Sequence, residues 1–368
     1  MCCDASANIV PISKITLKNF RCFESLDLEL SPKTNFFYGK NGSGKTSILE
    51  AVYLCSSGKS FKSSNISALI NQNNKQGFKV KAFDSEIGHI IEINKHQTKP
   101  IEIHYNNQKI PIAKLARKKP ATAIHNQTFS FADASPDFRR KLLDRAIFIS
   151  NKRFSHTWFG YYRSLKQRNT LLKQNTANTN VWDDSLIEHG EALNQIRQEF
   201  HNNTMEELKS LIENVSKTHK LTYLKDINIT FRQGWDEDQS LRQCIEENNN
   251  KDKHRRTTTK GPHKADIKFY IGNIDAKQIL SRGEQKLFSI LWCCSQHKVL
   301  KNIHNLDPTL IIDDIKSELD NNLMSVFVEA LNYIENQVIF SCIDDQFSSK
   351  INSNFEDFKK FHVEQLHY

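Results

Sequence analysis

Residues 34–56 read TNFFYGKNGSGKTSILEAVYLCS and set a glycine-rich loop between a strand pattern and a helix pattern. The run from Thr34 to Tyr38 is short and apolar, as in a buried strand, and residues 47–56 carry apolar side chains at helical spacing. The loop itself, GKNGSGKT at 39–46, fits the pattern G-x-x-x-x-G-K-[ST]. Because strand, loop and helix follow in this order, the pattern predicts a loop that binds the phosphates of a nucleotide.

The residue types of this loop suit a polyphosphate. Glycines let the backbone turn so that successive N–H groups face the anion, and the helix N-terminus adds about half a positive charge. We expect Lys45 to pair with the β- and γ-phosphates and the Thr46 hydroxyl to ligate Mg²⁺. The predicted ATP-binding loop comprises Gly39, Lys40, Asn41, Gly42, Ser43, Gly44, Lys45 and Thr46. A glycine turn that only caps a helix is the alternative, but it explains neither Lys45 nor the strand.

A second apolar strand pattern ends in two carboxylates, in TLIIDDI at 309–315. A phosphate-binding loop needs a metal ligand from another strand, so we expect Asp313 to bind the magnesium ion. Asp314 would point toward the γ-phosphate, where a carboxylate orients or deprotonates the attacking water. Asp314 and Lys45 are therefore the predicted catalytic residues, and a solvated loop at a strand end is the structural alternative.

The remaining patterns divide the chain into a head and an insertion. Alternating residues from about 78 to 110 predict an antiparallel ribbon, and residues 135–213 have helical periodicity without sustained heptads. Toward the C-terminus, strand patterns at 309–312 and 338–341 flank an amphipathic stretch at 319–334, which indicates a parallel α/β unit.

Composition indicates a folded protein of the cytoplasm. The 368 residues are 38% hydrophobic and 25% charged, and eight cysteines occur without a C-x-x-C pair, so a zinc site or disulfide framework is not indicated. We expect neither secretion nor a membrane span, because no apolar run approaches about 18 residues. Lys and Arg exceed Asp and Glu by 51 to 42, which favours a polyanionic partner such as nucleic acid.

A third motif changes the interpretation from a generic nucleotide site to a two-subunit site. SRGEQ at 281–285 opens an amphipathic helix, and with the loop and the acid pair it resembles the signature motif of ABC-type ATPases. In that family the signature of one subunit closes over the ATP held by the other, so the resemblance implies an ATP-dependent homodimer with Ser281 and Gly283 at the nucleotide. SELD at 317–320 is similar to the D-loop that crosses this interface.

The distance from Lys45 to Ser281 is too long for a transporter subunit and too short for SMC proteins with long coiled coils. The chain instead resembles the RecF family of ABC/SMC-like ATPases over nearly its whole length. The matching segments are ITLKNFRCF (15–23), SPDFRRKLLD (135–144), WDDSLIEHG (182–190), TTTKGPHKAD (257–266), SRGEQK (281–286) and IIDDIKSELD (311–320).

This resemblance implies an α/β fold, an ABC/SMC-type P-loop ATPase head with an inserted, mainly helical second lobe. We expect the head to comprise residues 1–120 and 259–368, and the lobe residues 121–258. The implied function is ATP-dependent dimerisation on DNA in recombinational repair and replication restart, with weak hydrolysis as a switch. The implied partners are the mediators RecO and RecR, the recombinase RecA, and DNA at single-strand gap edges. Another SMC-like DNA-linked ATPase and a transporter ATPase subunit are the alternatives.

Two further nucleotide contacts come from the resemblance. Arg21 is similar to the arginine that meets nucleotide phosphate in SMC-like heads, although a surface arginine on a strand is the alternative. Gln127 is the candidate for the Q-loop role of sensing the γ-phosphate and metal, and a polar loop residue without a site function is the alternative.

Clusters of basic residues suggest where DNA binds. The predicted DNA contacts are Lys251, Lys253, Arg255, Arg256, Lys260, Lys264, Arg139 and Arg140. A second basic stretch lies at 114–119, and any one cluster can instead be a solvated face. The lack of aromatic residues interleaved with the basic ones favours contact with a duplex or junction backbone over reading of bases.

Overall fold

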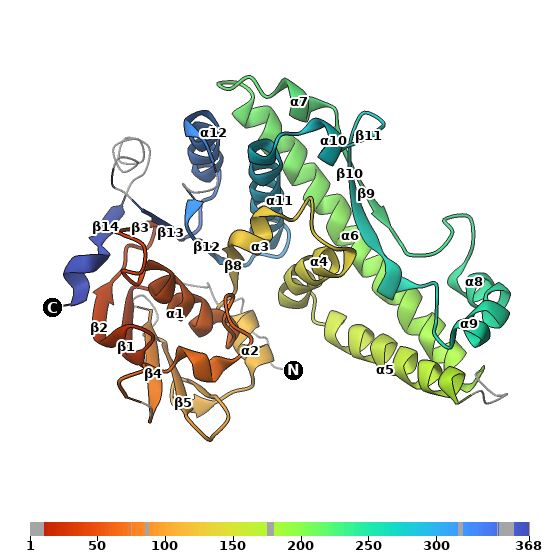
Figure 1. Cartoon of the computed structure of the whole chain (residues 1–368), viewed down its shortest axis with the longest axis horizontal. Coiled ribbons are helices and arrows are strands. Elements are labelled where there is room, and N and C mark those ends of the chain that lie inside the picture. The colour runs from red at the N-terminus through yellow and green to blue at the C-terminus, as the bar shows by residue number, and fades with distance from the viewer. Residues whose placement is uncertain are drawn as a thin grey trace. The chain divides into compact units, whose positions relative to one another are not determined.

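The computed structural model describes residues 11–74, 76–84, 88–174, 180–315, 319–343, 345 and 357–367, and the chain forms two compact units (Figure 1). Unit 1 is Met1–Phe129 together with Arg282–Tyr368, and unit 2 is Ser130–Ser281. Unit 2 is therefore an insertion between two parts of unit 1. No helix of the described residues is both long enough and apolar enough to cross a membrane.

A parallel sheet of five strands carries the glycine-rich loop in unit 1. Its spatial order is β14-β3-β13-β12-β8. The strands are β3 (Thr34–Tyr38), β8 (Ala121–Ile124), β12 (Thr309–Ile312), β13 (Val338–Cys342) and β14 (Phe358–His362). Nearly every residue of β3, β12 and β13 is buried, as expected for parallel strands that are covered on both faces.

The second sheet of unit 1 is antiparallel and contains the predicted ribbon. Its order is β2-β1-β4-β5-β6-β7. The strands are β1 (Lys14–Phe20), β2 (Phe23–Glu29), β4 (Gly77–Phe83), β5 (Ile90–His96), β6 (Glu102–Tyr105) and β7 (Gln108–Lys109). Asn106 and Asn107 both have positive φ, so the turn between β6 and β7 uses the residue type that best tolerates this conformation after glycine.

Helix α1 (Lys45–Ser57) is buried between the two sheets of unit 1. It contacts β12 and β13 of the parallel sheet and β1, β4 and β5 of the antiparallel sheet. Apolar residues around its circumference, such as Leu49 and Val52, are fully buried, and each contributes about 2 kcal/mol to folding. The other helices of unit 1 are η1 (Ile66–Leu69), α2 (Ile112–Lys118), α3 (Asn126–Phe129), α11 (Arg282–Asn302), α12 (Asn321–Asn332) and η5 (Val363–His367).

Unit 2 is mainly helical but contains a sheet that periodicity did not predict. Strands β9 (Ile227–Arg232), β10 (Asp266–Ile271) and β11 (Ile274–Asp275) form an antiparallel sheet. The helices are α4 (Pro136–Ser150), α5 (Phe154–Lys173), η2 (Asn180–Trp182), α6 (Asp183–Val215), α7 (Thr222–Lys225), α8 (Leu241–Glu247), α9 (Asn249–Arg255), η3 (Pro262–Lys264) and α10 (Ala276–Ile279). Gly190 lets α6 approach its neighbours, because a Cβ there would lie 2.5 Å from Leu241.

Ion pairs buried in unit 2 join the segments that resemble the family. Arg139 contacts Asp266 through two hydrogen bonds of 2.8 and 2.9 Å. Arg197 binds Asp144 in the same bidentate way, with both bonds at 2.7 Å, and also donates to the carbonyl of Pro262. Because removal of one partner from such a pair leaves an uncompensated buried charge, these motifs hold the lobe together.

The limits of the two units differ from the expected ones at both ends of the insertion. Residues 121–129 belong to unit 1, since β8 pairs with β12 in the parallel sheet. Residues 259–281 belong to unit 2, since β10 pairs with β9. Strand partners that lie more than 30 residues away decide both limits.

Candidate nucleotide-binding site

The predicted phosphate-binding loop joins β3 to α1. Gly42 and Gly44 have φ values of 85° and 105°, a region that glycine adopts without strain. At Gly44 a Cβ would lie 2.7 Å from the ring of Phe23, so any side chain there would collide with β2. Helix α1 has no side-chain cap and no acidic residue in its first turn. Its N-terminal amides and the positive end of its dipole are thus available to an anion.

Lys45 is held over the loop by the loop's own backbone. Its Nζ donates to the carbonyl oxygens of Gly39 and Lys40, at 2.6 and 2.9 Å, and the residue is only 7% exposed. Burial lowers the pKa of the ammonium, while the carboxylates of Asp314 and Asp313 act in the opposite direction. The ammonium is therefore partly dehydrated and already directed at the centre of the loop, which suits it to an anionic ligand.

Thr46 and Asp313 meet although they lie 267 positions apart. The Thr46 hydroxyl is 3.0 and 3.1 Å from the two carboxylate oxygens of Asp313. Ser341 at the end of β13 donates to Asp313 at 2.8 Å, and burial raises the pKa of this carboxyl. The sheet order explains this contact. Strands β3, β13 and β12 are parallel neighbours, so the loop after β3, Ser341 of β13 and Asp313 after β12 all lie at the same edge of the sheet.

Asp314 lies beside the loop in an unusual backbone conformation. Its φ is 53°, and its N–H donates to Ser341 Oγ at 2.9 Å. A left-handed aspartate is uncommon, and such residues concentrate at functional sites. Its position among the residues that line the cleft suits the predicted role toward the γ-phosphate.

The oxygen ligands that Thr46 and Asp313 offer suit a Mg²⁺ ion that is also bound by water and phosphate, rather than a metal ion bound only by protein side chains. Thr46 and Asp313 together offer hydroxyl and carboxylate oxygens, which are the ligands that Mg²⁺ prefers. Within the described ranges, no group of three His, Cys, Asp or Glu side chains could hold a metal ion. A magnesium ion here would complete its coordination with water and with the phosphates of a nucleotide.

A cleft of about 800 Å³ opens over the loop and is large enough for a nucleotide. Predominantly polar residues line it, from the loop, from the turn after β1 and from the segment between η1 and β4. They are Arg21, Cys22, Asn41, Gly42, Gly44, Lys45, Thr46, Ser47, Lys62, Ala68, Ile70, Asn71, Gln72, Asn73 and Asp314. The cleft thus combines the predicted phosphate site with a polar wall on the side of the antiparallel sheet.

Arg21 is in the cleft, but a buried carboxylate holds its guanidinium. Nε and Nη2 of Arg21 donate to the two oxygens of Glu50, at 2.8 and 3.0 Å, and Nη1 donates to the Ala68 carbonyl. Glu50 lies on α1 and is fully buried. Its bidentate contact fixes the arginine at the wall of the cleft, where the predicted contact with nucleotide phosphate remains a proposal.

The predicted signature and D-loop residues lie at element ends. Ser281 is the last residue of unit 2, and Gly283 lies in the first turn of α11 in unit 1. A Cβ on Gly283 would meet Leu323 at 2.8 Å, so the glycine also permits close packing with α12. In SELD only Leu319 and Asp320 are described, and Asp320 caps α12. The Gln127 side chain lies outside the described part of the chain, so its predicted role stays a prediction.

Two of the predicted DNA contacts need correction. Arg139 is 4% exposed, and its guanidinium is bound to Asp266 and to backbone carbonyls, so it cannot reach a phosphate. Arg140 donates to the carbonyl of Ala265 at 2.6 Å, and its side chain is mostly buried. Strand β10 packs against α4, which places Ala265 and Asp266 next to these two arginines. Both arginines therefore stabilise unit 2.

The predicted DNA contacts between residues 251 and 264 are mostly exposed, unlike Arg139 and Arg140. Lys260 is paired with Asp236 at 3.1 Å. The other members of this stretch are exposed and make no ion pair among the described residues; they are Lys251, Lys253, Arg255, Arg256 and Lys264. These five cations stay proposed DNA contacts.

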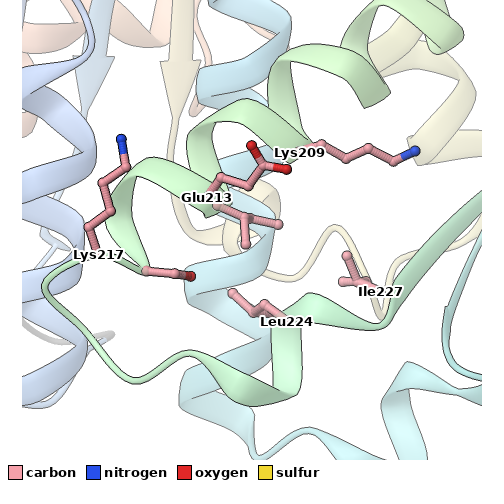
Figure 2. Close-up of a pocket in the computed structure, with 7 residues that line it drawn as sticks. Lys209, Glu213, Lys217, Leu224 and Ile227 are labelled. Carbon is pink, nitrogen blue, oxygen red and sulfur yellow. The ribbon is translucent and has the colours of Figure 1, made fainter.

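A second cavity, of about 450 Å³, lies in unit 2 between α6 and α7 (Figure 2). Its apolar floor includes Leu224 and Ile227, and Lys209, Glu213 and Lys217 stand at its rim. It has neither a glycine-rich loop nor a set of metal-ligating side chains, so it lacks the features that make the cleft of unit 1 a nucleotide site.

Sequence reasoning missed several residues of the cleft. Glu50 and Ser341 bind Arg21 and Asp313, and Gln72 and Asn73 belong to the polar wall. Ser341 ends a predicted strand of the parallel sheet, so the rule that ligands bind at the carboxyl ends of such strands could have found it. Glu50 gave no such signal, because an acid on a helix is usually solvated.

Comparison with known proteins agrees with this geometry. Residues 11–364 match the family model described as RecF/RecN/SMC N terminal domain. The DNA replication and repair protein RecF of Shewanella frigidimarina is 31% identical over 365 residues, covering 96% of this chain and 98% of that protein. The protein of the same name from Vibrio atlanticus is 33% identical over 361 residues, with the same coverage.

Solved structures support the fold. The chain is similar to the recombination mediator protein RecF with ATP in the RecFOR pathway, with a TM-score of 0.78 at 22% identity, covering 98% of both chains. It is also similar to an Smc head bound to the C-winged helix domain of ScpA, with a TM-score of 0.55 at 14% identity, covering 95% of this chain and 93% of that one. The predicted ABC/SMC-type head fold is confirmed.

Proposed function

The chain belongs to the RecF family of DNA replication and repair proteins, and we propose that it is an ATP-dependent clamp that dimerises on DNA at single-strand gaps. In this proposal each subunit holds ATP in its own cleft, and Ser281 and Gly283 of the other subunit close over it. The observation that carries the proposal is the contact between Thr46 and Asp313 beside the buried Lys45, because this geometry is built for a nucleotide with a metal ion.

The residues of the cleft divide the chemistry of ATP hydrolysis among them. Lys45 and the amides of the loop neutralise the phosphates, and Thr46 with Asp313 would hold Mg²⁺. The ion would supply positive charge between the β- and γ-phosphates. Asp314, which lines the cleft near Lys45, accepts a proton from the attacking water or orients it. Hydrolysis then resets the dimer.

Partners of the pathway belong to the same proposal. A related solved protein is described as a recombination mediator in the RecFOR pathway. By the family resemblance, this chain would cooperate with RecO and RecR and assist loading of the recombinase RecA at gap edges. The excess of Lys and Arg over Asp and Glu supports a DNA partner.

Asp314→Asn should separate binding of ATP from its hydrolysis. The amide keeps the shape of the side chain but loses the negative charge that activates water, so single-turnover hydrolysis should slow by on the order of 100-fold while ATP affinity stays within about threefold. Asp313→Asn is the matched variant, because it should instead weaken Mg²⁺-dependent ATP binding. Hydrolysis at the wild-type rate in Asp314→Asn would move the role of the water-activating acid to another residue.

The clamp itself is tested by sedimentation velocity of the full chain with ATP, ADP or no nucleotide, each with and without gapped DNA. We expect a dimer only with ATP, and co-sedimentation with DNA in the same condition. A distribution that is the same under all three nucleotide conditions would contradict the ATP-dependent clamp, even if ATP binds.

A further inference from the structure

Helix α5 has an outer face that carries positive charge without any acid. Its twenty residues include neither Asp nor Glu. Residues spaced three and four apart lie on one face of a helix, and those that form this stripe and are exposed are His156, Phe159, Arg163, Lys166, Thr170 and Lys173. We call them the α5 stripe. Arg163, Lys166 and Lys173 make no ion pair among the described residues.

Phe159 lies within the stripe and is 66% exposed. Single apolar side chains are common on protein surfaces. An exposed phenylalanine among cations, however, has the arrangement of the aromatic residues on which the bases of single-stranded nucleic acids stack. Trp158 packs against it edge to face, with ring centroids 5.2 Å apart. Trp158 thus contacts one side of the Phe159 ring, and most of the surface of Phe159 remains exposed to solvent.

Helix α9 lies beside α5, and a buried ion pair joins the two helices (Figure 1). Arg168 on the inner face of α5 donates to Asp252 of α9 at 2.7 Å, and both side chains are fully buried. Asp252 also accepts hydrogen bonds from the backbone N–H and the hydroxyl of Thr259. The single acid of residues 249–265 is thus withdrawn into the interior.

The withdrawal of Asp252 leaves the cations of α9 without an exposed acid in their own helix. We call the exposed residues Lys251, Lys253, Arg255 and Arg256 the α9 cluster. Two other acids of unit 2 are paired elsewhere, since Asp184 binds Arg242 and Asp236 binds Lys260, while Glu246 and Glu247 at the end of α8 are exposed. A concentration of unpaired charge of one sign destabilises a fold unless it meets a partner of the opposite sign.

We propose that the α5 stripe and the α9 cluster bind DNA that carries unpaired bases, with the cations on backbone phosphates and Phe159 stacked on a base. This proposal rests on the proposed repair function and names the surface that would contact the DNA. It also changes the preference for pure backbone contact that the sequence suggested, because Phe159 offers the aromatic face that the basic segments lacked.

The cations and Phe159 should affect DNA binding in different, measurable ways. Each cation that neutralises a phosphate releases counter-ions, so the loss of three of them should lower the salt slope of duplex binding by about 2.7. Stacking of one base is sequence-tolerant and is lost on substitution of the ring, at about 1–3 kcal/mol or roughly 5- to 150-fold in Kd. Only DNA with an accessible base should respond to the ring.

The test measures the Kd of the full chain with ATP by fluorescence anisotropy, for blunt duplex and for duplex with a single-stranded tail, over a salt series. Arg163→Ala/Lys166→Ala/Lys173→Ala should weaken both DNAs about tenfold or more at 0.15 M salt and lower the salt slope. Phe159→Ala should weaken only the tailed DNA. The control Lys209→Ala/Lys217→Ala/Lys220→Ala removes the same charge in the last turns of α6 and in the segment that follows it, and should change little. Thermal unfolding verifies that each variant is folded.

Each other outcome has a defined meaning. If the α5 triple variant binds both DNAs as the control does, the surface is wrong, whereas a wild type that binds no DNA contradicts the proposed function instead. Equal weakening of blunt and tailed DNA by Phe159→Ala would overturn the stacking role. If Phe159→Ala leaves DNA binding unchanged but alters the sedimentation of the chain, Phe159 contacts protein rather than DNA.

Discussion

Lys45→Ala should raise the Kd for ATP by roughly 100-fold or more, the largest effect expected of any single substitution in the cleft. The ammonium is nearly buried and held at the centre of the loop by the carbonyls of Gly39 and Lys40. Its removal leaves phosphate charge in a poorly hydrated place without its partner, which costs about 3 kcal/mol or more.

Equilibrium binding of a fluorescent ATP analogue measures this effect. Lys40→Ala is the matched control: Lys40 contacts Lys45 through its backbone carbonyl, which the substitution keeps, and the exposed side chain that it removes carries the same charge in the same loop. We expect the control to change Kd by less than about threefold. Equal effects of the two substitutions would mean that general positive charge, and not the geometry of Lys45, binds the nucleotide.

Ser281→Arg should abolish ATP-dependent dimerisation while the monomer still binds ATP. In the proposed clamp, Ser281 of one subunit approaches the γ-phosphate held by the other, so a long cationic side chain there prevents closure. Lys45, Thr46 and Asp313 belong to a cleft that a single subunit completes, and ATP affinity should stay within about threefold of the wild type.

Sedimentation with ATP and gapped DNA decides the matter. Ser210→Arg, the same substitution at an exposed position of α6, serves as the control and should dimerise normally. An ATP-dependent dimer of Ser281→Arg on gapped DNA would show that the signature does not act across the interface. The nucleotide cleft would then serve a different kind of P-loop ATPase.

The two charged clusters illustrate how far sequence reasoning reaches. Arg139 and Arg255 have the same side chain, and each lies in a basic segment. Arg139 is buried because Asp266, 127 positions later, returns to it through the pairing of β10 with β9. Arg255 is exposed because the nearby acid, Asp252, is held instead by Arg168 of α5. Neither contact, Arg139 with Asp266 or Asp252 with Arg168, joins residues that are close in the sequence, so the composition of the local segment does not predict it.

Local sequence patterns were enough to predict the strand, the phosphate-binding loop, the first helix and the acid pair at 313–314. Each depends on a local requirement: glycines with positive φ, a lysine and a hydroxyl at fixed positions, and carboxylates directly after an apolar strand. Other features depend on contacts between distant segments: which charges face solvent, the binding of Arg21 by Glu50 and of Asp313 by Ser341, and the exposure of Phe159 among cations. The physical reason is that the free energy of a charge depends on its partner and its hydration, and distant segments of the chain supply both.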